Sequence, residues 1–142
     1  VETLMPRLRE IMSSDKPLIE RLALVVDEYF ERVLESPSIP GFIISEIQRD
    51  VEHFIATARE MHYDKVFSLV RDVLNSEMKA GRLKQVPMYT VFTAFYGNIA
   101  FPFITRNLFV SWFNMDENEY RAMIMEWKKY LLMQISNLLV EK

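Results

Sequence analysis

Hydrophobic positions along the chain recur every three to four residues, which is the spacing of one face of an α-helix. No segment alternates apolar and polar residues for long enough to indicate a β-strand. The pattern therefore predicts an all-α fold, an orthogonal or antiparallel bundle of about six helices. We expect these helices over residues 1–12, 18–35, 41–50, 57–80, 87–110 and 117–140.

Turn and capping residues indicate where the helices begin and end. Pro17 suits the first turn of the second helix, and Gly81 suits the position just after a helix C-terminus. The sequence Thr-Ala-Arg-Glu at residues 57–60 fits a capping box, which predicts the start of a long helix that ends near Ala80. Residues 51–56 remain ambiguous between helix and loop.

The segment 87–113 organises the chain, because no charged residue occurs from Gln85 to Thr105. Two apolar stripes run along it on nearly opposite sides, and a helix that is apolar on two sides is buried on two sides. We expect one side to face its own domain and the other a second copy of the chain. Pro102 predicts a kink near residues 99–101. The stripes are Met88, Phe92, Phe95, Ile99 and Phe103, and Thr90, Ala94, Gly97, Phe101, Ile104 and Leu108.

Two other interpretations of this segment stay open. The uncharged run is long enough to cross a bilayer, although it contains Asn98 and Pro102 and no cluster of Lys or Arg flanks it. It is equally consistent with the central helix of a monomeric bundle, since fully buried helices are also apolar all round.

Composition limits the possible classes of protein. The 142 residues correspond to one domain, residues 1–142, and the 50% hydrophobic content excludes disorder. A formal net charge of −3 offers no basic surface for nucleic acid. The absence of cysteine suits a reducing cytoplasm, and residues 1–12 lack the apolar core of a signal peptide. The chain opens with Val1 within a helical pattern, so we expect it to be part of a longer protein.

Motifs for catalysis are lacking, so we expect neither an enzyme nor a cofactor. There is no glycine-rich phosphate loop and no nucleophile motif. The best metal-binding alternative is Glu46, Asp50 and His53, which would share one face of a continuous helix. A solvated helix edge explains the same three residues, and we predict no metal site.

Four features occur in a fixed order along the chain. They are Leu-Glu-Ser-Pro at 34–37, Ile-Pro-Gly-Phe-Ile-Ile-Ser-Glu at 39–46, Met-Lys-Ala-Gly-Arg-Leu at 78–83, and the paired last two helices. Together they are similar to the C-terminal, ligand-binding and dimerising domain of tetracycline-repressor (TetR) family transcription regulators. The resemblance implies a cytoplasmic, homodimeric effector-sensing domain of a repressor. DNA binding would belong to an N-terminal helix-turn-helix domain outside this chain, with residues 1–12 as the end of the linking helix. The alternative is a freestanding helical interaction module or carrier of hydrophobic ligands.

Aromatic residues and methionines are numerous enough to line an apolar pocket for a small apolar or aromatic molecule. We expect helices beginning near residues 18, 40, 59 and 88 to enclose it. The predicted pocket residues are Phe67, Met88, Phe92, Phe95, Tyr96, Ile99 and Phe103. The predicted homodimer contact, an intersubunit four-helix bundle, contains Ala94, Gly97, Phe101, Ile104, Leu108, Trp127, Leu131, Gln134 and Leu138.

Overall fold

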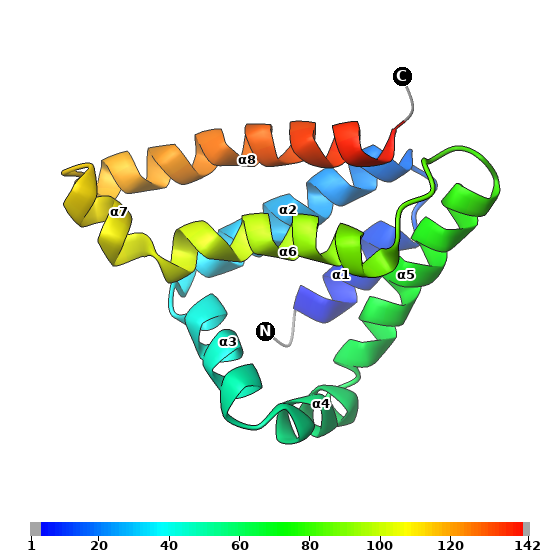
Figure 1. Cartoon of the computed structure of the whole chain (residues 1–142), viewed down its shortest axis with the longest axis horizontal. Helices are drawn as coiled ribbons and strands as arrows, with labels where there is room; N and C mark the ends of the chain where they lie inside the picture. The colour runs from blue at the N-terminus through cyan, green and yellow to red at the C-terminus, as the bar shows by residue number, and fades with distance from the viewer. Residues whose placement is uncertain (1–3, 141–142) are drawn as a thin grey trace.

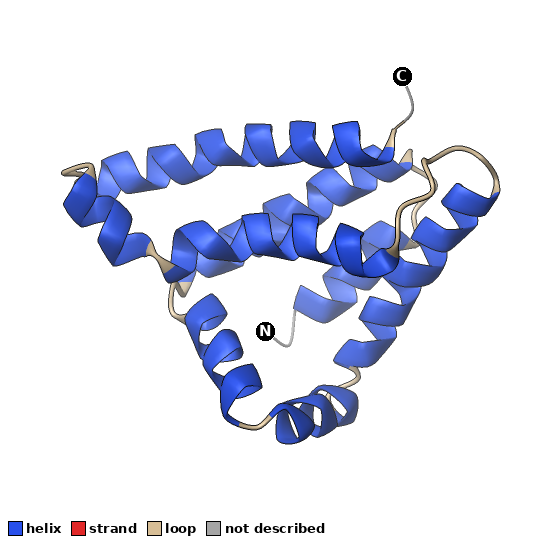
Figure 2. Ribbon diagram, in the orientation of Figure 1, coloured by secondary structure: helices blue, strands red, loops and turns tan. Residues whose placement is uncertain are grey.

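Eight helices and no strand make up residues 4–140, the part of the chain that the computed structural model describes (Figures 1 and 2). The all-α prediction is confirmed. The expected number of about six helices is too low, because two expected helices are each divided in two. The helices are α1 (Leu4–Met12), α2 (Leu18–Glu35), α3 (Ile39–Arg49), α4 (Val51–Glu60), α5 (Tyr63–Lys79), α6 (Met88–Ile104), α7 (Arg106–Trp112) and α8 (Glu117–Leu139).

The first division separates α4 from α5. Asp50 caps α4, because its carboxylate accepts a hydrogen bond from the backbone N–H of His53 at 3.0 Å. The chain is therefore already helical when it reaches Thr57, and the predicted capping box at residues 57–60 is wrong. His62 has a φ of 64°, a left-handed conformation that ends α4 before α5 starts at Tyr63.

The second division separates α6 from α7 at Thr105, beyond the kink expected at residues 99–101. Pro102 stays inside α6, although a proline in a helix interior costs about 3 kcal/mol when nothing compensates for the missing N–H. The orphaned acceptor four residues earlier is the carbonyl of Asn98. The indole N–H of Trp127 on α8 donates to it at 2.9 Å. Nearby, the hydroxyl of Tyr120 donates to the carbonyl of Pro102 at 2.8 Å.

The core lies between α2, α6 and α8. Figure 1 shows α6 and α8 running antiparallel along the length of the molecule, with α2 behind them. α8 buries one side completely, and α1 packs against α2 and α5 at the edge of this core. The largest fully buried side chains of α2 and α8 are Val26, Phe30, Val33, Tyr120, Ile124, Leu131, Ile135 and Leu139.

The helices α3, α4 and α5 form a frame that extends away from this core (Figure 1). α3 contacts α6, α4 contacts α3 and α5, and only the far end of α5 reaches the main core. α3 buries Pro40 alone, and α4 buries no residue at all. Phe42, Val51 and Ile55 are exposed. α3 and α4 are therefore held by few buried contacts, whereas α5 buries Val66, Leu74 and Met78.

Two predicted helix ends are confirmed. Gly81 follows α5 with a φ of 80°, and its N–H donates to the carbonyl of Met78 at 3.1 Å. Asp116 and Glu119 form a reciprocal capping box at the start of α8. Across the described part of the chain, no helix combines the length and hydrophobicity needed to span a bilayer.

Candidate ligand site and outer face

Four aromatic rings form a continuous chain across α5, α6 and α2. Phe67 of α5 meets Phe92 of α6 edge to face, with ring centroids 5.9 Å apart. Phe92 contacts Tyr96 one helical turn later at 5.8 Å, and Tyr96 meets Tyr29 of α2 edge to face at 6.3 Å. We call these four residues the aromatic cluster. It joins three residues of the predicted pocket to one that was not predicted.

The aromatic cluster is only partly covered by the rest of the chain. Phe67 and Phe92 are each 53% exposed, whereas the rings of Phe30, Phe103 and Tyr120 are buried in the core. No acidic or basic side chain belongs to the cluster. A half-exposed apolar surface that bridges three helices can receive a small apolar molecule without moving the core.

The other four predicted pocket residues lie elsewhere. Ile99 and Phe103 are buried in the core, where Phe103 meets Phe30 edge to face at 5.4 Å, and they do not join the aromatic cluster. Met88 and Phe95 are half-buried and pack against the same core. The apolar stripe of this helix therefore splits, because one part faces α2 and α8 while Phe92 meets Phe67 of the frame.

Tyr29 of α2 was not predicted as a binding residue, and its side chain is half-buried against the core. Its hydroxyl oxygen is buried and makes no hydrogen bond of ordinary geometry with any described residue. Burial, and to a lesser extent the neighbouring Tyr96 side chain, raises the pKa of Tyr29 well above its usual value of 10.0. Tyr63 lies one helical turn before Phe67, and its hydroxyl oxygen is also buried without a hydrogen bond to any described residue. A tyrosine within an apolar stripe was the available sequence signal.

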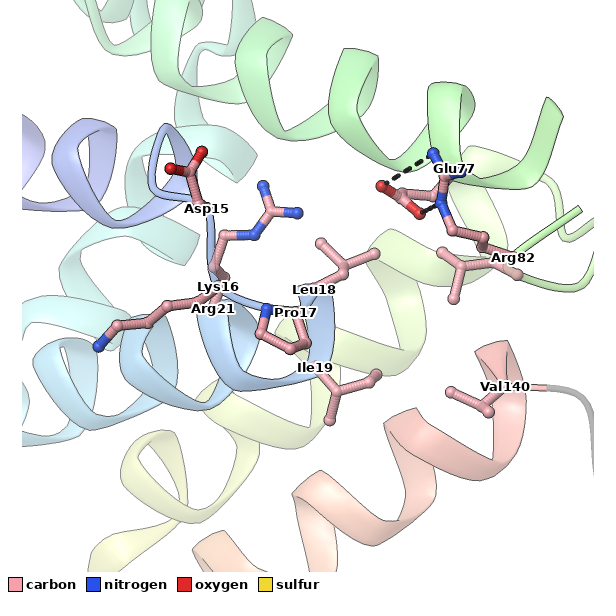
Figure 3. Close-up of a pocket in the computed structure, with 10 residues that line it drawn as sticks. Asp15, Lys16, Pro17, Leu18, Ile19, Arg21, Glu77, Arg82 and Val140 are labelled. Carbon is pink, nitrogen blue, oxygen red and sulfur yellow. Dashed lines mark hydrogen bonds and ion pairs between the residues drawn. The ribbon is translucent and has the colours of Figure 1, made fainter. Parts of the chain in front are cut away.

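A hollow of about 340 Å³ lies at another place, between the α1–α2 turn and the ends of α5 and α8 (Figure 3). Both charged and apolar side chains line it, and Glu77 and Arg82 pair with each other there. A second hollow beside it, of about 330 Å³, is also lined by Arg21 and Glu77. Neither hollow contains a residue of the aromatic cluster, so neither is the predicted apolar pocket.

The predicted dimer residues divide into exposed and buried groups. Gly97, Phe101, Ile104 and Leu108 are exposed along α6 and α7, as is Gln134 on α8. We call these five residues the outer face. Ala94, Trp127 and Leu138 are half-buried and pack against the core. Leu131 is 0% exposed, so its assignment to a contact between two copies is wrong, because its side chain is enclosed within one chain.

An aromatic group that the sequence did not reveal continues this face towards α7. Phe101 meets Phe109 edge to face at 6.2 Å, and Phe109 stacks on Phe113 at 5.7 Å. Trp112 and Phe113 are exposed at the end of α7. The break at Thr105 brings these rings together, because it turns α7 away from the axis of α6 (Figure 1).

Comparison with known proteins identifies no relative. The chain matches no family model, no curated protein and no solved structure. Its function is inferred below from its own residues.

The metal-binding alternative receives no support from the arrangement. Glu46 on α3 pairs with Arg49 at 2.6 Å, and this hydrogen bond lowers the pKa of the Glu46 carboxyl. Asp50 caps α4 and so divides the helix that would have aligned the three side chains. Among the described residues, no group of three or more His, Asp or Glu side chains is placed to hold a metal ion.

Proposed function

We propose that the chain is the effector-binding and dimerising domain of a TetR-like transcriptional repressor. It binds a small apolar or aromatic molecule in the cytoplasm, and that event alters DNA binding by an N-terminal helix-turn-helix domain of the full-length protein. The domain itself has no catalytic role and needs no cofactor or metal. The similarity at residues 34–46 and 78–83 is the starting point for this proposal.

The observation that carries the proposal is the pair of exposed apolar surfaces on α6. Phe92 and Phe101 are 53% and 57% exposed. They are nine residues apart, which places them about 180° apart around the helix at roughly 100° per residue. Ile99 and Phe103, which are buried in the core, lie on the same side of α6 as Phe92, so this side faces the core further along the helix and is exposed at Phe92. One helix thus serves two external contacts, a ligand at the aromatic cluster and a second copy at the outer face.

This arrangement supplies a physical route for regulation. A ligand at the aromatic cluster touches α5 and α6 directly and α2 through Tyr29. α6 carries the outer face, and α1, which packs against α2 and α5, would follow the linking helix of the full-length protein. A ligand that binds one arrangement of these helices more tightly shifts the population towards it and changes the spacing of the two DNA readers.

The outer face suits a two-fold contact between copies. Gly97 lets two helices approach closely, and the large side chains of Phe101 and Ile104 flank it. A stable homodimer contact of this kind should bury more than ~1,000 Å² in total, most of it apolar. Because a two-fold axis brings the same residue of each copy into the contact, a charge placed at its centre meets its own copy.

Gly97→Glu tests the dimer, with Gly41→Glu on α3 as the matched control. An added Cβ meets no atom within 4 Å at either glycine, so both variants should fold and keep the wild-type circular dichroism spectrum. We expect light scattering at micromolar concentration to show a dimer for the wild type and for Gly41→Glu. Gly97→Glu should be a monomer, because two unpaired charges would be buried together. A dimeric Gly97→Glu protein would contradict the outer face as the contact.

A carrier module without a DNA reader is the competing function. The coding sequence ahead of Val1 separates the two. Roughly 45–60 residues with a basic helix-turn-helix pattern support the repressor, whereas a start codon at or just before Val1 contradicts it.

A further inference from the structure

The two hollows beside the α1–α2 turn share a basic side chain, Arg21 of α2. Arg21 is partly exposed and forms no ion pair with any described residue. Its Nη1 donates to the carbonyl of Met12 at 2.9 Å, and its Nε has no acceptor among the described residues. Asp72 of the second hollow pairs with Arg71 and not with Arg21. A guanidinium is always charged and donates from each of its nitrogens, so Arg21 keeps donors for a further acceptor.

The first hollow has an excess of positive charge. Three basic residues line it, Lys16, Arg21 and Arg82, against two acidic residues, Asp15 and Glu77, which leaves one positive charge. Glu77 and Arg82 neutralise each other as an ion pair. Lys16 and Asp15 are both exposed, and neither forms an ion pair in the described part of the chain. A ligand with a single negative charge would balance the excess.

The rest of this hollow is apolar. Figure 3 shows the charged ends of Asp15, Arg21 and Glu77 towards α5, and the side chains of Ile19 and Val140 towards the end of α8. Its volume of about 340 Å³ is within the range of small-molecule sites. The hollow therefore suits a small molecule with an acidic end and an apolar end. Its apolar lining residues are Pro17, Leu18, Ile19, Leu83 and Val140.

We propose that this hollow is a second ligand site, which binds a small aliphatic carboxylate. Arg21 and Lys16 hold the carboxylate, and the hydrocarbon chain lies against Ile19 and Val140. The planar guanidinium of an arginine matches the two oxygens of a carboxylate, whereas a phosphate monoester carries more negative charge than the single excess positive charge balances. Because Arg21 also holds the carbonyl of Met12, the last residue of α1, the bound ligand restrains the end of that helix.

Isothermal titration calorimetry of the whole chain tests the ligand class with octanoate, octanamide and octylamine. The three probes share one hydrocarbon chain and differ in the charge of the end group. We expect octanoate to bind about tenfold more tightly than octanamide, the value of one hydrogen bond to a charged group. Octylamine, which is a cation at neutral pH, should bind most weakly. Added salt should weaken the binding of octanoate and leave that of octanamide unchanged, because salt screens partly exposed charges.

Substitutions at the two basic residues locate the site. Lys16→Gln removes an exposed charge that has no ion pair in the described chain, so the fold should be retained. Octanoate should then bind nearly as weakly as octanamide. Arg21→Gln should lower octanoate affinity further, but it also loses the hydrogen bond to Met12, so its circular dichroism spectrum must be compared with that of the wild type. Arg9→Gln, an exposed arginine on α1 outside the hollow, is the matched control and should bind octanoate as the wild type does.

Three outcomes would overturn this inference, and they differ in what they mean for the proposed function. Equal binding of octanoate and octanamide, unchanged in Lys16→Gln and Arg21→Gln, contradicts the carboxylate site. Octanoate binding that is lost in Phe92→Ala and retained in both of these variants moves the ligand to the aromatic cluster, which contradicts the second site and supports effector binding. No binding of octanoate to the wild type contradicts the second site alone, because the aromatic cluster shares no residue with the hollow.

Discussion

The α2–α6–α8 core and the α3–α4 part of the frame are both made of helices rich in apolar residues, yet they bury very different amounts of their apolar surface. On α8, Ile124, Leu131 and Ile135 are almost completely buried. No residue of α4 is buried, and its Ile55 is 48% exposed. Since burial of apolar surface supplies most of the folding free energy, the core provides the stability of this domain. α3 and α4, which bury little, can move at lower energetic cost.

The largest expected difference comes from the same substitution made in both regions. Ile124→Ala on α8 should lower the free energy of unfolding by about 2–5 kcal/mol, because it leaves a cavity among fully packed side chains. Ile55→Ala on α4 should change it by less than about 0.5 kcal/mol, since that side chain already faces solvent. Urea denaturation of the two variants measures both values. Similar losses would contradict the contrast between core and frame.

A smaller difference should distinguish the two buried tyrosines. Tyr120→Phe orphans the carbonyl of Pro102 and should cost about 1–3 kcal/mol of stability. Tyr29→Phe removes a hydroxyl that has no partner in the described chain, so it should be neutral or slightly stabilising. Thermal unfolding at neutral pH compares them directly. If Tyr29→Phe destabilises as much as Tyr120→Phe, the Tyr29 hydroxyl is bonded within the chain.

The smallest expected effect is a dependence of stability on alkaline pH. Burial raises the pKa of Tyr120 from 10.0 to about 12, and it also raises that of Tyr29. A raised pKa means that the unfolded chain releases the proton first. The stability linked to Tyr120 is therefore complete below pH 10 and is lost as the pH rises towards 12. Melting temperatures recorded over this range should fall less steeply for Tyr120→Phe and for Tyr29→Phe than for the wild type.

The helical pattern alone allowed much of the architecture to be predicted. Apolar spacing located α1, α2 and α8 closely, and Gly81 marked the end of α5 where the structure has it. The break at His62 could not be foreseen, because a histidine carries no strong turn preference and the Thr57 signal pointed to another start. The division at Thr105 was missed for a similar reason, because Pro102 led us to expect the kink at residues 99–101 instead.

The binding surfaces were harder to predict from the sequence than the helices. Leu131 and Gln134 belonged to one predicted contact, yet Leu131 is enclosed and Gln134 is exposed, with its side chain 3.4 Å from the amide of Asn98. Phe92 and Phe103 were placed in one pocket, yet Phe103 belongs to the core. The sequence shows which residues are apolar, and their spacing shows on which side of the helix each one lies. It does not show which neighbouring helix covers that side.

What the sequence by itself determined is the class of the fold and the positions of most helices, because these depend on interactions between residues three or four apart. Only the tertiary structure decided which sides of α6 face inward, because that helix is apolar nearly all round and its sides are equivalent until α2 and α8 pack against it. The same holds for Pro102. Its tolerance within α6 depends on the indole of Trp127 on α8, which donates a hydrogen bond to the carbonyl of Asn98 that Pro102 leaves without an N–H partner.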